Sequence, residues 1–133
     1  MDVEIKGMAP LLQVYDMPAT LAFYRDILGF AIVESDGPPE TADWIWMNWH
    51  GVHLMFNTAY ERAHRPSMPD ARRIAAHNDT SLYFVCPNVD ALYEYLSAKA
   101  VKTDPPTVTK YGYKALYVKD PDNYLLVFHW PVQ

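Results

Sequence analysis

The sequence predicts an α+β fold of two tandem βαβββ modules, whose strands form a curled mixed sheet around an open cleft. The first observation is the order of the apolar segments, which reads strand, helix and three strands, and then repeats. The second observation comes from comparing the sequence with itself. At an offset of 71 residues, each predicted element of the first half coincides with a predicted element of the second half. A repeated unit buries the same face twice, so two similar modules are the most economical interpretation.

Length and composition limit the classes of protein to which the chain can belong. Its 133 residues suit one domain, and half of them are apolar, which excludes a disordered chain. The net charge of −5 argues against nucleic-acid binding, which needs a basic surface. No apolar run approaches the roughly 20 residues that span a bilayer, and Cys86 has no second cysteine to pair with. We therefore expect a single cytoplasmic domain, residues 1–133, without a membrane or nucleic-acid partner.

The first module is predicted to span about residues 7–57. Its helix is expected near 17–28, because Asp16 and Pro18 form a helix start and Gly29 can close the helix as a left-handed cap. Its strands are apolar runs bounded by turn residues, at 8–15, 30–35, 43–49 and 52–57.

The second module is predicted to span about residues 80–131, after a connecting loop at 58–79 with one helical turn near 70–75. Its helix is expected near 88–99, with Asn88 as the N-cap. Its last two strands are joined by DPDN, a sequence rich in turn-forming residues. The predicted strands are 80–86, 108–111, 114–119 and 124–130.

Two motifs resemble the vicinal oxygen chelate superfamily, which contains glyoxalase I, bleomycin-resistance proteins and extradiol dioxygenases. The first is VYDMPATLAFYRDILGF at residues 14–30, and the second is KYGYKALYVKDPDNYLLVF at residues 110–128. Both occur in the order and at the spacing typical of that superfamily. The resemblance covers essentially the whole chain, and it implies paired βαβββ modules, an open cleft and usually a homodimer.

The resemblance also assigns the positions at which catalytic members hold a divalent metal. In this sequence those positions are Ala9, Thr80, Val127 and Phe56, and none of them is a usual metal ligand. A different register of the first hairpin would bring His53 to such a position, but a lone imidazole does not hold a catalytic metal. We therefore expect no metal and no other cofactor.

Strand alternation predicts which residues face the cleft. If DPDN, residues 120–123, is the loop of the last hairpin, Leu116 pairs with Val127, and Lys114 pairs with His129. The 71-residue shift transfers this alternation to the first module, and the result is a mostly apolar cleft with a few polar groups. The candidate ligand-binding residues are Gln13, Asp43, Met47, Phe56, Phe84, Lys114 and His129.

The same reasoning assigns other aromatic and basic residues. Trp44 and Trp46 are predicted to point toward the helix and pack in the core. Trp49, Tyr111 and Tyr113 are freer to meet a ligand or a second subunit. The connecting loop carries four arginines that either remain solvated or form a lid that attracts an anion. They are Arg62, Arg65, Arg72 and Arg73.

Three functions remain open at this point. Apolar walls with few polar groups favour a metal-free protein that binds a small aromatic or heterocyclic molecule, for instance to sequester a drug or toxin. Lys114 and His129, expected side by side, would suit an acidic ligand. The alternative is an enzyme of the same superfamily, either a metal-dependent lyase or dioxygenase or an isomerase, although no residue is assigned a catalytic role. The third is an interaction domain without activity.

Overall fold

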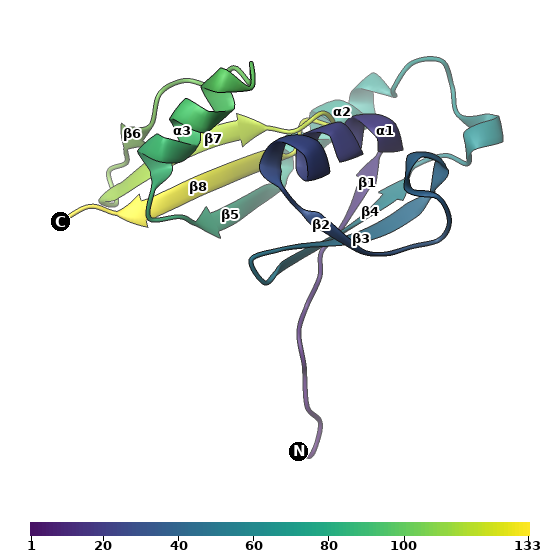
Figure 1. The fold of residues 1–133 in the computed structure, drawn as a ribbon, viewed down its shortest axis with the longest axis horizontal. Coiled ribbons are helices and arrows are strands. Elements are labelled where there is room, and N and C mark those ends of the chain that lie inside the picture. Colours follow the sequence, from purple (N-terminus) through teal and green to yellow (C-terminus); the bar gives the residue numbers. More distant parts are fainter. The chain divides into compact units, whose positions relative to one another are not determined.

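Each half of the chain forms its own four-stranded mixed sheet in the computed structural model, which describes residues 1–133 (Figure 1). The halves are two compact units, Met1–Ser67 and Met68–Gln133, called the first and the second unit below. Both units contain a strand, a helix and three further strands in this order. The predicted α+β class and the repeated order of elements are therefore confirmed.

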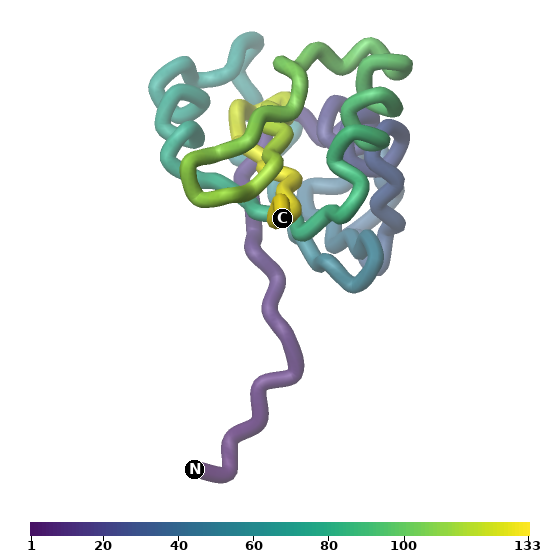
Figure 2. The backbone as a smooth tube through the Cα atoms, turned by 90° about the vertical axis from the view of Figure 1, so that its left-hand side faces the viewer, coloured from purple at the N-terminus to yellow at the C-terminus, as the bar shows by residue number.

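The first unit opens with an arm, residues 1–10, that has no secondary structure (Figure 2). Its helical segment runs between the first two strands and consists of α1 (Met17–Leu21) and η1 (Ala22–Leu28). Two short turns follow, η2 (Pro39–Thr41) and η3 (Arg62–His64). The strands are β1 (Leu11–Val14), β2 (Ala31–Ser35), β3 (Trp44–Trp49) and β4 (Val52–Thr58). They lie in the order β1-β4-β3-β2, with β1 parallel to β4.

The helical segment of the first unit begins and ends where the sequence predicts. Asp16 accepts a hydrogen bond from a first-turn amide as the N-cap, and Gly29 ends the segment in the left-handed conformation at φ 103°. The second part, η1, is π-helical, and the amides of Gly29 and Phe30 both donate to the Tyr24 carbonyl. The Tyr24 ring is fully buried, 4.6 Å from the ring of Phe56, so the helix packs on the sheet through this pair.

The second unit repeats this arrangement. It starts with α2 (Ala71–Ala76) and η4 (His77–Asp79), close to the predicted helical turn. Helix α3 (Val89–Ala98) packs on the last two strands and covers one face of the sheet. The strands are β5 (Ser81–Val85), β6 (Thr107–Val108), β7 (Tyr113–Lys119) and β8 (Leu125–Pro131), in the order β5-β8-β7-β6. None of the helices in the chain combines the length and apolar character needed to cross a membrane.

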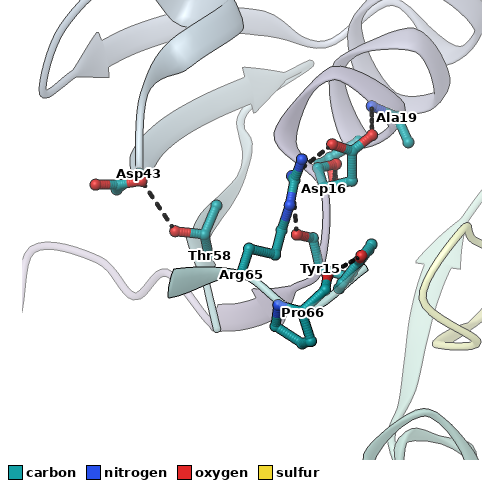
Figure 3. Close-up of polar contacts among 8 residues, drawn as sticks. Tyr15, Asp16, Ala19, Asp43, Thr58, Arg65 and Pro66 are labelled. Carbon is teal, nitrogen blue, oxygen red and sulfur yellow. Dashed lines mark hydrogen bonds and ion pairs between the residues drawn. The ribbon is translucent and has the colours of Figure 1, made fainter. Parts of the chain in front are cut away.

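A polar network ties the segment after β4 to the start of α1 (Figure 3). Arg65 Nη1 lies 2.7 Å from Asp16 Oδ1, and the guanidinium stands over the Tyr15 ring. The Tyr15 hydroxyl donates to the Pro66 carbonyl at 2.5 Å. Asp16 is therefore both helix cap and ion-pair partner, and Arg65 is held in the first unit by this contact.

We predict that Asp16→Ala lowers the free energy of unfolding by about 1–2 kcal/mol, because it removes a helix cap together with an ion pair. Asp26→Ala is the matched control. The Arg25 side chain, hydrogen-bonded to Asp26, lowers the pKa of that carboxyl, but the pair is exposed and caps no helix. Urea denaturation should show a clear loss for Asp16→Ala and little change for the control, and equal losses would contradict the double role of Asp16.

Candidate ligand-binding site

The turn between β7 and β8 sets the register of the second sheet. Asp120 is buried, and its Oδ1 accepts the amides of Asp122 at 2.9 Å and of Tyr124 at 2.8 Å. Asn123 takes the left-handed conformation at φ 70°. The turn therefore includes Tyr124, which the sequence analysis counted as the first residue of the strand. Val118 consequently pairs with Leu126, one residue away from the predicted register.

The prediction that Lys114 and His129 lie side by side is therefore wrong. Lys114 pairs with Trp130, and His129 pairs with Ala115. A slip of one residue moves every side chain of a strand to the other face. Lys114 lies on the helix-covered face, where its Nζ is 2.5 Å from Asp90 Oδ2 of α3. His129 lies on the opposite face, which no helix of the second unit covers and which we call the open face.

Three apolar candidates from the sequence analysis also lie on helix-covered faces, so their assignment to the cleft is wrong. Met47 and Phe56 are fully buried in the first unit, and Phe84 is buried and stacks on Phe128 in the second unit. The uniform 71-residue shift is the cause for Phe56 and Phe84, whereas Met47 was placed by analogy with Val118 and shares the error in the register of β7. Leu12 pairs with Phe56, and Leu82 pairs with Leu126, so these strand pairs repeat at an offset of 70 residues.

The middle strands repeat at another offset. Ile45 pairs with Phe56 and Val118 pairs with Leu126, which gives an offset of 73 residues between β3 and β7. One offset is even and the other is odd, because the lengths of the two turns differ by an odd number: the turn between β7 and β8 is three residues longer than the His50-Gly51 turn between β3 and β4. No single shift could therefore carry the face assignment from one unit to the other.

The open face of the first sheet carries a polar and aromatic cluster that includes Gln13. Trp46 lies on this face, because it alternates with the buried Ile45 and Met47. Trp44 shares this parity, so the prediction that Trp44 and Trp46 point toward the helix is wrong. The Trp46 indole N–H donates to His53 Nδ1 at 3.0 Å.

Two further candidates have structural contacts in the first unit. Asp43 precedes β3, and its Oδ1 accepts the Thr58 hydroxyl at 3.2 Å (Figure 3). It borders a hollow of only about 50 Å³, too small for an organic ligand. The Trp49 ring lies 5.1 Å from the Phe30 ring, so it packs against the core instead of standing free for a ligand.

The open face of the second sheet contains a hollow of about 460 Å³, within the range typical of small-molecule sites. Val127 pairs with Tyr83 on one side and with Tyr117 on the other, so the three side chains form a row across the sheet. We call this site the tyrosine hollow. It is lined by Tyr83, Thr109, Tyr111, Tyr113, Ala115, Tyr117, Val127 and His129.

The tyrosine hollow offers both aromatic surface and unused hydrogen-bonding capacity. The His129 ring lies 4.9 Å from the Tyr113 ring and 5.2 Å from the Tyr83 ring. The hydroxyls of the four tyrosines and both ring nitrogens of His129 have no hydrogen-bond partner in the chain. The four tyrosine residues are between 37% and 77% exposed, so a ligand can reach them. The hollow can therefore stack a flat molecule and bind its polar edge.

Neither open face holds a set of donors that fits a divalent metal. In the second sheet, β8 offers Leu125, Val127 and His129, of which only the histidine is a usual ligand. In the first sheet, the Nδ1 lone pair of His53 already accepts the Trp46 indole N–H. Within each unit, three or more His, Cys, Asp or Glu side chains do not come together. The residues present therefore do not fit the three-ligand site of a metal-dependent enzyme.

The model of the glyoxalase/bleomycin resistance protein/dioxygenase superfamily matches residues 8–128. The chain belongs to this superfamily. The match covers both units and includes the turn that sets the register of β7 and β8. The resemblance inferred from the two sequence motifs is therefore confirmed.

Solved structures of other superfamily proteins share the fold. A bleomycin-binding protein in complex with bleomycin is 20% identical, with a TM-score of 0.71 over 96% of this chain and 100% of that one. A glyoxalase family protein from Enterococcus faecalis is 26% identical, with a TM-score of 0.65 over 96% and 97%. A lactoylglutathione lyase from Agrobacterium tumefaciens is 16% identical, with a TM-score of 0.66 over 94% and 93%. No protein of curated function matches the sequence.

Sequence reasoning identified His129 as a candidate and singled out Tyr111 and Tyr113, but it missed Tyr83 and Tyr117. The missed signal lies in the turn, because an aspartate that accepts the amides two and four residues later draws the residue after DPDN into the turn. With that residue removed from the strand, alternation brings Tyr113, Tyr117 and His129 to one face. The pairing of Tyr83 with Val127 adds a third tyrosine to this face.

We predict that Trp46→Phe destabilises the fold more than Trp44→Phe does. Both residues lie on the same strand and face, but Trp46 alone donates to His53, and its loss leaves a half-buried acceptor unpaired. The difference between the two variants should be about 0.5–1.5 kcal/mol in urea denaturation. Equal effects would show that the contact between Trp46 and His53 contributes nothing to stability.

Proposed function

We propose that the protein binds a small planar organic molecule in the tyrosine hollow without the help of a metal ion. The observation that carries this proposal is a cavity of about 460 Å³ whose aromatic walls retain unpaired hydroxyls and an unpaired imidazole. Stacking on the rings supplies affinity, and the polar groups fix the orientation of the ligand. Sequestration of an aromatic or heterocyclic drug or toxin is the function that fits these properties best.

Two further observations support the proposal. Val127 stands in the middle of the tyrosine hollow, at the position to which the sequence resemblance assigns a metal ligand in catalytic members. A valine there supplies apolar surface where an enzyme of the superfamily needs an oxygen donor. The structural neighbours also include a protein crystallised with bleomycin, so this fold accommodates organic ligands.

The proposal predicts that quinoline, a neutral planar heterocycle at pH 8, binds in the tyrosine hollow. Tyr117→Leu and Tyr83→Leu should each weaken binding by about 2- to 10-fold, because each removes one stacking surface. Nuclear magnetic resonance titration of the full chain measures the affinity and also identifies the residues whose signals shift.

Tyr95→Leu is the matched control for this experiment, since Tyr95 is an exposed tyrosine on α3, outside the hollow. It should leave the affinity unchanged. Shifts confined to residues outside the hollow, or equal losses in all three variants, would contradict the proposed site. The substituted tyrosines are partly exposed, so the variants should remain folded.

The proposal also predicts that elemental analysis of the untagged protein finds no stoichiometric transition metal. Neither sheet brings three suitable ligands together, and treatment with a chelator should change neither the fold nor quinoline binding. One equivalent of zinc, nickel, iron or manganese per chain, lost in His53→Gln or His129→Gln, would contradict metal-free binding.

We further propose that the protein acts as a homodimer in the cytoplasm. The dimer is the usual state implied by the resemblance to the superfamily. The exposed apolar side chains of β5, including Val85 at 72% exposure, are compatible with a covered surface in an assembly. The lone Cys86 suits a reducing compartment.

A further inference from the structure

The residues that line the tyrosine hollow carry no fixed charge. Rings dominate the lining, and it contains no Asp, Glu, Lys or Arg. Lys114, which the sequence analysis expected here, lies on the other face of the sheet and is ion-paired with Asp90. An anionic ligand would therefore lose hydration on entering the hollow without gaining an opposite charge from the residues that line it.

The rings favour the opposite sign of charge. The face of an aromatic ring carries a negative electrostatic potential, which attracts a cation within about 6 Å of the ring centre. Tyr83 and Tyr113 both lie against His129, so several ring systems are available around one ligand. The unpaired tyrosine hydroxyls add oxygen atoms that can accept hydrogen bonds from a cationic group.

A lysine beside the hollow limits which rings a cationic ligand can use. Lys110 Nζ stands 5.2 Å from the centre of the Tyr111 ring, so a positive charge already covers that ring. The rings left for a ligand cation are those of Tyr83, Tyr113 and Tyr117. The net charge of −5 also raises the concentration of cations near the protein.

We infer that the tyrosine hollow selects planar organic cations, such as N-alkylated heteroaromatic rings, over neutral or anionic rings of the same shape. The inference rests on the proposed function, because it names the class of ligand for the same site. It reverses the preference for an acidic ligand that the sequence analysis derived from Lys114.

The test compares three probes of nearly the same shape with the full chain at pH 8. They are 1-methylquinolinium, 1-methylnaphthalene and 1-naphthoate. The cation should bind about 3- to 30-fold more tightly than the neutral probe, and the anion should bind most weakly. Tyr117→Leu should reduce the advantage of the cation, and Tyr95→Leu should preserve it.

The outcomes separate this inference from the proposed function. If the neutral or anionic probe binds in the hollow as tightly as the cation, the inference is overturned and the proposed function stands. If none of the three probes and no quinoline binds there, both are overturned. Binding of the cation outside the hollow, unaffected by Tyr117→Leu, also overturns the inference.

Discussion

The hydrogen bonds of one buried aspartate determine which chemistry the second sheet presents. Asp120 holds the amides of Asp122 and Tyr124, and this turn fixes how β7 and β8 pair. Because side chains alternate across a strand, the turn decides that His129 faces the open side and that Lys114 faces α3. The tyrosine hollow exists only in this register.

Other contacts hold the same turn in place. The His77 ring stacks on Tyr124 at 4.1 Å, and His77 Nδ1 lies 2.7 Å from the Asp122 carbonyl. The Asn123 side chain donates to the Ile74 carbonyl at 2.9 Å. The segment before β5 is therefore packed against the turn. The segment that contains α2 and η4 therefore has a structural role, which its charged sequence does not suggest.

The two open faces of the sheets differ in how their polar groups are used. In the first sheet the His53 ring accepts the Trp46 indole, so its contacts are made within the protein. In the second sheet the His129 ring meets only tyrosine rings, and its nitrogens remain available. Superfamily membership accounts for the shared fold of such proteins, while the side chains on each open face decide what the fold can bind.

The sequence by itself determined the α+β class, the repeated order of elements, the helix limits at Asp16 and Gly29 and the family, because these depend on local patterns and short motifs. It also marked His129, Tyr111 and Tyr113. Tertiary structure alone decided the faces. A strand has a side-chain period of two, so a change of register by one residue moves every side chain to the other face. Asp120 draws one extra residue into its turn, and the open face therefore carries tyrosines instead of Lys114. No local sequence pattern indicates this change.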